Sequence, residues 1–234
     1  MEINAAAMWL NTTFASFDLS VTKAIHTLAE PAGWFLTPFF KWYGALLSKG
    51  GALLIVLSIL LLLFKRTRRY GTAMALALAF GALITNCCVK VFVARPRPFS
   101  DPTSEYYQMW LTVGQAMERD KSFPSGHVTA AVGSMLALFL STEKKQVTWL
   151  YLLFPVGMMI CRIYLVIHYP TDVIGGLIVG AFSGVLAYYV MIRLPADYYR
   201  ASDFIPKNRI TVQKGKIVGS NKNRKSKRGG KHCR

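Results

Sequence analysis

Charged side chains are absent from five long stretches of this 234-residue chain, and that absence decides its class. The stretches cover residues 50–64, 70–89, 124–142, 147–161 and 173–192, and none contains Asp, Glu, Lys or Arg. A transmembrane helix needs about 20 mostly apolar residues, and each stretch reaches or approaches that length with its flanks. This pattern excludes an ordinary soluble domain of the same length. It predicts an all-α integral membrane protein, a bundle of about five to six transmembrane helices with interfacial N-terminal helices.

Cysteines are few and have no regular spacing. The four, Cys87, Cys88, Cys161 and Cys233, form neither a disulfide framework nor a metal-ligand pattern. We expect them to be small, polarisable core residues. We also expect no cleavable signal peptide, because the N-terminus lacks a basic region and Ala5–Leu10 is too short an apolar core.

Acidic residues are missing from the end of the chain. Residues 206–234 hold eleven Lys or Arg and no Asp or Glu, within a net charge of +17. Such a tail is typical of disordered segments that lie against anionic lipid head groups on the cytoplasmic side. Nucleic acid is the alternative partner, but nothing else in the chain supports it. We therefore divide the chain into N-terminal interfacial or re-entrant helices (1–47), a transmembrane core (48–195) and a basic cytoplasmic tail that we expect to be disordered (196–234).

The basic clusters orient the spans. Residues 65–69 (KRTRR) follow the first span, so the positive-inside rule makes that loop cytoplasmic. Alternation then places segments 95–123 and 162–172 outside and the basic tail inside. The sequence predicts a multi-pass cell-membrane protein with its functional face external and its C-terminal tail cytoplasmic.

The first 47 residues are harder to interpret. Phe17–Ala29 has the pattern of an amphipathic helix, with Ser20 or Asp18 as its N-cap. Aromatic residues between 34 and 43 favour the membrane–water interface. We expect interfacial or re-entrant helices here, with one further span as the alternative.

Three short clusters carry the chemistry: KVFVARPRP at 90–98, PSGH at 124–127 and RIYLVIHYPTD at 162–172. Lys90, Arg97 and Arg162 bring three cations from two spans, and Arg can bind two phosphate oxygens at once. Ser125 and Gly126 open a helix, where free backbone N–H groups bind anions. A single cation at a span end often only extends to the lipid head groups. Three cations beside Ser-Gly-His favour a phosphate site instead.

Two histidines accompany these cations. His168 and Asp172 are four residues apart, so they share one face if the segment is helical. A carboxylate held against one imidazole nitrogen leaves the other free to attack. His127 comes from another span and is suited to protonate a leaving oxygen. The alternative for any single histidine is a hydrogen-bonded core residue without a chemical role.

We expect no metal and no cofactor. Two histidines and a carboxylate are a ligand set for iron or zinc, but three cations in the same pocket would repel a divalent ion. The expected partners are a lipid phosphate and the membrane, with anionic head groups for the tail and no nucleic acid.

The three clusters resemble the signature of the type-2 phosphatidic acid phosphatase superfamily, and bacterial members that act on undecaprenyl pyrophosphate in particular. The family pattern is Lys, six residues, Arg-Pro; then Pro-Ser-Gly-His; then Ser-Arg, five residues, His, three residues, Asp. Residues 90–98, 124–127 and 161–172 match it in order and spacing, except that Cys161 replaces the usual Ser. That change removes one expected hydrogen bond to phosphate. The resemblance covers about residues 50–193.

The resemblance implies a metal-independent phosphatase. By analogy His168 would be the nucleophile that forms a phosphohistidine, Asp172 would orient it, and His127 would act as acid and then base. Charge on the phosphoryl oxygens would be stabilised by the rest of the motif: Lys90, Arg97, Ser125, Gly126 and Arg162. The substrate expected on this analogy is undecaprenyl pyrophosphate, with phosphatidylglycerol phosphate and phosphatidic acid as alternatives. Other functions for the same pocket are a lipid phosphotransferase, a vanadate haloperoxidase, and a transporter or scaffold without catalysis.

Overall fold

The structure is a computed structural model that describes residues 4–143, 145–195 and 198. The regular elements of this part of the chain are all helical. They are α1 (Ala5–Thr13), α2 (Ala15–His26), α3 (Ala29–Ala45), α4 (Ser48–Leu63), α5 (Arg68–Ala82), the π-helix η1 (Leu83–Val89), α6 (Lys90–Val93), the 3₁₀-helix η2 (Pro98–Ser100), α7 (Glu105–Thr112), α8 (Gly126–Ser141), α9 (Lys145–Thr148), the 3₁₀-helix η3 (Trp149–Leu152), α10 (Leu153–Tyr164) and α11 (Pro170–Met191).

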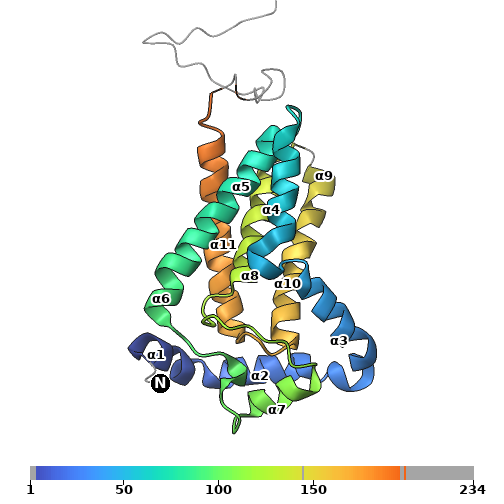
Figure 1. Ribbon diagram of the computed structural model, residues 1–234, viewed down its shortest axis with the longest axis vertical. Helices are drawn as coiled ribbons and strands as arrows, with labels where there is room; N and C mark the ends of the chain where they lie inside the picture. Colours follow the sequence, from blue (N-terminus) through green and yellow to red (C-terminus); the bar gives the residue numbers. More distant parts are fainter. Residues whose placement is uncertain (1–3, 144, 196–197, 199–234) are drawn as a thin grey trace, which may run out of the picture.

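Five long helical segments form the bundle. Helix α11 packs against α8 and α5, α4 packs against α5, and α10 closes the other side of α8 (Figure 1). Three helical segments are long and apolar enough to cross a membrane: Arg68–Val93, Gln146–Tyr164 and Pro170–Met191. Gly51–Leu63 and Gly126–Ser141 are shorter apolar helices. The prediction of an all-α integral membrane protein is confirmed.

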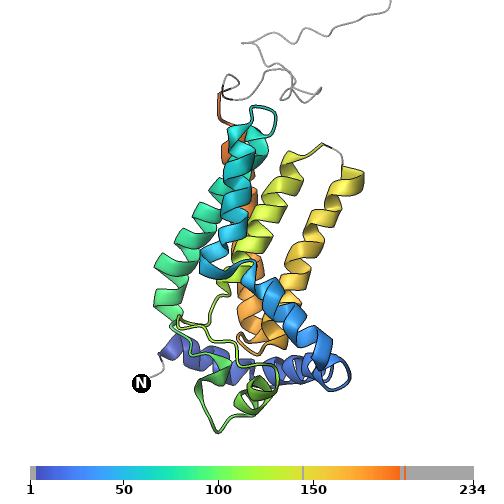
Figure 2. The same ribbon diagram turned by 45° about the vertical axis from the view of Figure 1, so that its right-hand side comes forward.

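The N-terminal helices cross one end of this bundle. Helices α1 and α2 lie roughly at right angles to the bundle axis (Figures 1 and 2). Helix α3 runs obliquely from their end of the bundle and packs against α10. Their outer faces carry exposed tryptophans, with Trp9 59%, Trp34 83% and Trp42 60% exposed. The turn between α4 and α5 and the C-terminal end of α11 lie at the opposite end (Figure 1).

The predicted cap of the amphipathic helix was wrong. Helix α2 begins at Ala15, after Phe14, and no side chain caps it. Asp18 is one turn inside the helix and 1% exposed, and Ser20 also lies within it. Asp18 turns inward because its carboxylate meets a buried cation, a contact that the local sequence cannot reveal.

Two of the cysteines also differ from expectation. Cys87 and Cys88 lie on the π-helix η1, and their side chains are on the outer surface of the protein, whereas Cys161 is buried. An outward face of a membrane span meets lipid, so small apolar side chains there need no protein core. The Cys161 thiol donates to the carbonyl of Phe40, 3.2 Å away, on α3.

Glycines let α11 approach α8 closely. A Cβ at Gly176 would lie 2.7 Å from the Ser125 carbonyl oxygen, and one at Gly180 would lie 2.8 Å from that of Thr129. Such small residues at four-residue spacing are typical of close helix packing in membranes. This contact fixes the start of α8 against the start of α11, where two of the three sequence clusters lie.

Candidate active site

The three sequence clusters meet at the end of the bundle that the N-terminal helices cover. Each contributes residues where a helix begins or ends: Lys90 after η1, Arg97 before η2, Ser125, Gly126 and His127 at the start of α8, Arg162 in the last turn of α10, His168 in the α10–α11 connection, and Asp172 in the first turn of α11. Helix ends converge there because the spans have similar lengths and alternate in direction. All of them except Gly126 and His127 are buried.

Arg97 lies at the centre of the site. Its Nη1 donates to the Ile167 carbonyl at 2.8 Å and lies 3.1 Å from Nε2 of His168. Its Nε donates to the Asp120 carbonyl at 2.9 Å. These contacts fix the guanidinium plane beside the imidazole nitrogen that the sequence predicts to be reactive.

His168 and Asp172 form the expected pair, at a distance longer than an ordinary hydrogen bond. Nδ1 of His168 lies 3.5 Å from Oδ2 of Asp172. The same oxygen accepts from the backbone N–H of Tyr169 at 2.9 Å and from the Ser122 hydroxyl. A carboxylate held by two other donors keeps its place beside Nδ1, which leaves Nε2 facing Arg97.

The imidazole of His168 is neutral in this site. Burial and then the positive charge of Arg97 lower its pKa to about 3, and Asp172 opposes this shift only partly. The connection that carries His168 is also strained, since the β-branched Val166 has a φ of +54°. Such a conformation costs about 1–3 kcal/mol and recurs at functional sites.

Glu118 places a carboxylate among the catalytic candidates. Its Oε2 lies 2.7 Å from Nη2 of Arg97, and its Oε1 pairs with Arg162. The two histidines flank it: Nδ1 of His127 lies 3.6 Å from Oε1, and Nε2 of His168 lies 3.7 Å from Oε2. The four side chains therefore converge on one oxyanion.

Asp120 pairs with the remaining cation. It contacts Lys90, and its Oδ1 lies 2.5 Å from Nη2 of Arg97. Burial disfavours the charged carboxylate, but the hydrogen bonds and charges of Lys90 and Arg97 outweigh it and lower the pKa of Asp120 to about 2. Asp120 is therefore ionised throughout the physiological range.

Two buried donors in the site have no hydrogen-bond partner in the described part of the chain. They are the hydroxyl of Ser125 and Nε of Arg162. A buried polar group without a partner is costly, about 1–3 kcal/mol, and calls for an explanation. Both groups belong to the motif predicted to bind phosphate, so an anion would satisfy them.

A cavity of about 420 Å³ opens from this cluster into the bundle. Lys90, Glu118, Arg119, Asp120 and His127 line it, together with residues of α4, α5, η1 and α8. Among residues 4–143, 145–195 and 198, no cluster of three His, Cys, Asp or Glu suits a metal ion.

The tertiary structure adds residues that the sequence analysis missed: Asp18, Arg95, Glu118, Asp120 and Ser122. Arg95 had a signal, because it repeats the Arg-Pro pattern two residues before Arg97. The acidic residues had none, since 118–121 (ERDK) is equally typical of a solvated loop.

The chain is similar in sequence to two named lipid phosphatases. A lipid A 4′-phosphatase of Bacteroides thetaiotaomicron is 29% identical over 127 residues, 54% of this chain and 56% of the relative. An undecaprenyl-diphosphatase of Sulfolobus acidocaldarius is 28% identical over 139 residues, 58% of this chain and 62% of the relative. The chain thus spans somewhat over half the length of these relatives.

A solved structure shares the fold. The PAP2-type phosphatidylglycerolphosphate phosphatase of Bacillus subtilis superposes with a TM-score of 0.61 at 24% identity, over 81% of this chain and 92% of the other. The profile of the PAP2 superfamily matches residues 66–195, more than half of the chain and all three clusters. The chain belongs to the PAP2 superfamily.

Proposed function

We propose that this protein is a metal-independent membrane phosphatase that hydrolyses a lipid phosphate or diphosphate through a phosphohistidine. The observation that carries this proposal is the position of Glu118, whose carboxylate contacts Arg97 and Arg162 and lies between His127 and His168. A phosphoryl group has the same charge sign and similar oxygen spacing, so these four side chains suit it equally well.

In the first step Nε2 of His168 attacks phosphorus, and the bond from phosphorus to the lipid oxygen breaks. The neutral imidazole has a free lone pair on Nε2 when Nδ1–H points to Asp172. His127 donates a proton to the leaving oxygen, which departs as an alcohol or, from a diphosphate, as a monophosphate. In the second step His127 takes a proton from water, the hydroxide attacks phosphorus, and inorganic phosphate leaves His168.

The remaining motif residues stabilise charge. Lys90, Arg97 and Arg162 neutralise the phosphoryl oxygens, while Ser125 and the backbone N–H of Gly126 donate hydrogen bonds. Fixed donors in a site that excludes water usually supply the largest part of phosphoryl-transfer catalysis. Three cations supply the charge that a metal ion supplies elsewhere.

Undecaprenyl diphosphate is the proposed substrate. The Sulfolobus relative is named for this reaction. Lipid A is the alternative suggested by the Bacteroides relative. Phosphatidylglycerol phosphate and phosphatidic acid complete the set to be tested.

The site would face outward and the tail would lie in the cytoplasm. The basic turn between α4 and α5 lies at the end of the bundle opposite to the site (Figure 1), so the positive-inside rule supports this orientation. The tail, 196–234, lies outside the described residues apart from Tyr198. Its proposed contact with anionic head groups rests on its charge alone.

The test is release of inorganic phosphate by the purified protein in detergent with a chelator present. Undecaprenyl diphosphate, lipid A, phosphatidylglycerol phosphate and phosphatidic acid are supplied separately to wild type and His168→Ala. We expect release from undecaprenyl diphosphate that the substitution abolishes, and a ³²P-labelled enzyme intermediate that is stable to base and labile to acid. Lys214→Ala in the tail is the matched control and should keep full activity.

Three results would contradict the proposal. Release that survives His168→Ala excludes the phosphohistidine. Loss of release with chelator excludes metal independence. Transfer of label to a lipid acceptor in place of water assigns the transferase alternative.

A further inference from the structure

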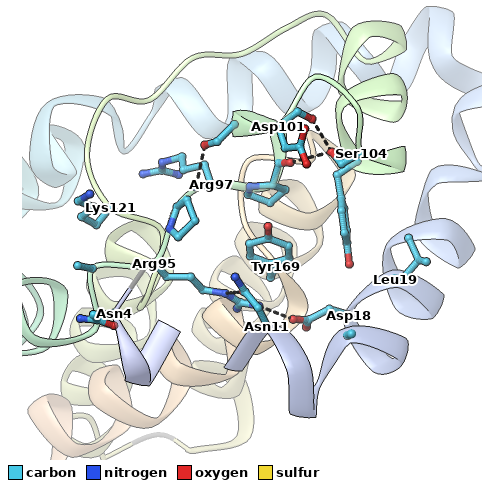
Figure 3. A pocket seen from close by; sticks show the side chains of 16 residues that line it. Asn4, Asn11, Asp18, Leu19, Arg95, Arg97, Asp101, Ser104, Lys121 and Tyr169 are labelled. Carbon is cyan, nitrogen blue, oxygen red and sulfur yellow. Dashed lines mark hydrogen bonds and ion pairs between the residues drawn. The ribbon is translucent and has the colours of Figure 1, made fainter. Parts of the chain in front are cut away.

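A second charged cluster lies behind the catalytic pair, outside the motif that binds phosphate. Arg95 is its centre and is 1% exposed. Its Nη1 donates to Oδ1 of Asp172 at 2.7 Å, and its Nη2 donates to Oδ2 of Asp18 at 2.9 Å. The guanidinium carbon lies 3.8 Å from the centre of the Tyr169 ring. Figure 3 shows Arg95 extended between Tyr169, Asn11 and Asp18.

Asp18 binds two elements at once. Besides Arg95, it accepts from the backbone N–H of Thr171 at 2.8 Å and from the Thr171 hydroxyl at 2.8 Å. Thr171 immediately precedes Asp172 in the first turn of α11. Helix α2 therefore holds the start of α11 through one carboxylate, at a sequence separation of 153 residues.

Every hydrogen bond described in this cluster involves an ionised group, either the guanidinium of Arg95 or a carboxylate. Burial would lower the pKa of Arg95, but Asp172 and Asp18 outweigh burial and raise it, so the guanidinium stays charged. Nε of Arg95 completes the set by donating to the Asn11 amide oxygen at 2.7 Å, on α1. The guanidinium thus makes four hydrogen bonds, to α1, α2 and the start of α11.

The two oxygens of Asp172 have separate partners. Oδ1 contacts Arg95, whereas Oδ2 faces Nδ1 of His168. If Arg95 were lost, only the two donors to Oδ2, the backbone N–H of Tyr169 and the Ser122 hydroxyl, would hold the carboxylate, and its ionised form would lose its main compensating charge. Either change would weaken the hold on Nδ1–H of His168.

We propose that Arg95 and Asp18 are positioning residues for the His168–Asp172 pair. This inference rests on the proposed phosphatase function and deepens it. Arg95 fixes the rotation of the Asp172 carboxylate, and Asp18 fixes Arg95 and the first turn of α11. The N-terminal helix α2 is thereby part of the active site, although it contributes no group that touches the phosphoryl oxygens.

A buried ion pair need not serve stability. Taking charges out of water costs several kcal/mol per ion, roughly, and replacing such a pair with apolar groups is often neutral or stabilising. Arg95 and Asp18 lie directly behind the Asp172 carboxylate, so holding that carboxylate in position explains them better than a gain in stability.

The experiment compares Asp18→Asn, Arg95→Met and Arg95→Lys with wild type in the phosphate-release assay. Two quantities are measured for each: kcat, and the inhibition constant of inorganic phosphate. Neither Arg95 nor Asp18 contacts the phosphate site, so the inhibition constant should stay within about twofold. A misplaced catalytic group can cost about 100-fold, so we expect kcat to fall about 100-fold in Arg95→Met and about tenfold in Asp18→Asn.

Rescue and non-additivity sharpen the test. Arg95→Lys keeps the charge but not the fork of donors, so its kcat should lie between those of wild type and Arg95→Met. Because part of the effect of Asp18 passes through Arg95, the double substitution should lose less kcat than the product of the two single losses. Glu105→Gln is the matched control: it removes an acid of α7 whose ion pair with Lys23 lies at the surface, and it should leave kcat unchanged.

Three outcomes would overturn the inference. One is a kcat within twofold of wild type in both Asp18→Asn and Arg95→Met. Another is a rise in the phosphate inhibition constant that parallels the loss of kcat, which is the sign of a loosened bundle. The third is absence of phosphate release from wild type, which overturns the proposed function and this inference with it; an active wild type with unaffected variants overturns only the inference.

If Arg95→Met does not fold, the kcat and the phosphate inhibition constant of Asp18→Asn alone decide the test.

Discussion

Oε2 of Glu118 lies 2.7 Å from Nη2 of Arg97, so a carboxylate from the α7–α8 connection pairs with a cation of the phosphate motif. An incoming phosphoryl group would compete with this carboxylate for the same donors. The relationship suggests that the connection adjusts the affinity of the site for anions, and it leads to the first two predictions.

Glu118→Gln should tighten anion binding. Removing the competing charge leaves Arg97 and Arg162 more available to an anion, and we expect the dissociation constant of inorganic phosphate to fall about tenfold, equivalent to about 1.4 kcal/mol. Isothermal titration of the purified protein with phosphate measures it. Glu143→Gln is the control, since Glu143 contacts Arg69 at the opposite end of the bundle. A weaker phosphate affinity in Glu118→Gln would mean that Glu118 supports the site.

Asp120→Asn should have a similar but smaller effect, because Asp120 contacts Lys90 and Arg97 and is more exposed to solvent. The gain in affinity for an anion of constant charge, such as sulfate, should be independent of pH. The pKa of Asp120 is about 2, below its ordinary value, so its charge is present at every pH well above 2 and is lost only in strong acid. Sulfate titrations of wild type and variant at pH 6, 7 and 8 check this. A gain that shrinks toward pH 6 would contradict the assignment.

Arg97→Lys should inactivate the enzyme although it keeps the charge. Lysine cannot donate to the Ile167 carbonyl and the Asp120 carbonyl while also facing Nε2 of His168, as Arg97 does. We expect kcat/KM to fall about 100-fold or more, the usual cost of losing an oriented donor to a developing charge. Phosphate release at several lipid concentrations measures it. A variant within threefold of wild type would show that charge alone suffices.

Acid should destabilise the folded protein partly through His168. Its folded pKa of about 3 lies below the ordinary 6.5, because burial and Arg97 disfavour the imidazolium. Its contribution to stability is therefore complete above about pH 6.5 and is lost as pH falls toward 3. Thermal unfolding in detergent from pH 7.5 to 4.5 should show a steeper loss in wild type than in His168→Gln. Equal slopes would mean that His168 is accessible to protons in the folded state.

Gly176→Ala should damage both packing and activity. A Cβ there would lie 2.7 Å from the Ser125 carbonyl oxygen and 3.0 Å from Cβ of Val128. Overpacking of this kind costs about 1–3 kcal/mol, and it would shift the turn that carries Ser125. We expect a lower unfolding temperature and a lower kcat. Ile178→Ala, on the lipid-facing side of the same helix and 63% exposed in wild type, is the control and should keep kcat.

Much of the fold could be predicted from local patterns. Charge-free runs gave the spans, and the structure has apolar helices over all five of them. The PSGH sequence predicted a helix start, and α8 begins at Gly126. These features depend on residues within one or two turns of each other. The cysteine pair on η1 was misjudged because hydropathy does not distinguish a face that meets lipid from one that meets protein.

The sequence by itself determined that this is an all-helical membrane protein with cations, histidines and a carboxylate at the ends of its spans, since hydrophobic length and motif spacing are local properties. Only the tertiary structure decided that Asp18 meets Arg95, 77 residues away, and that Glu118 enters the ring of cations. Burying charges is favourable only where opposite charges arrive together. Which charges arrive together depends on how the helix ends converge, and that is fixed by packing across the whole bundle.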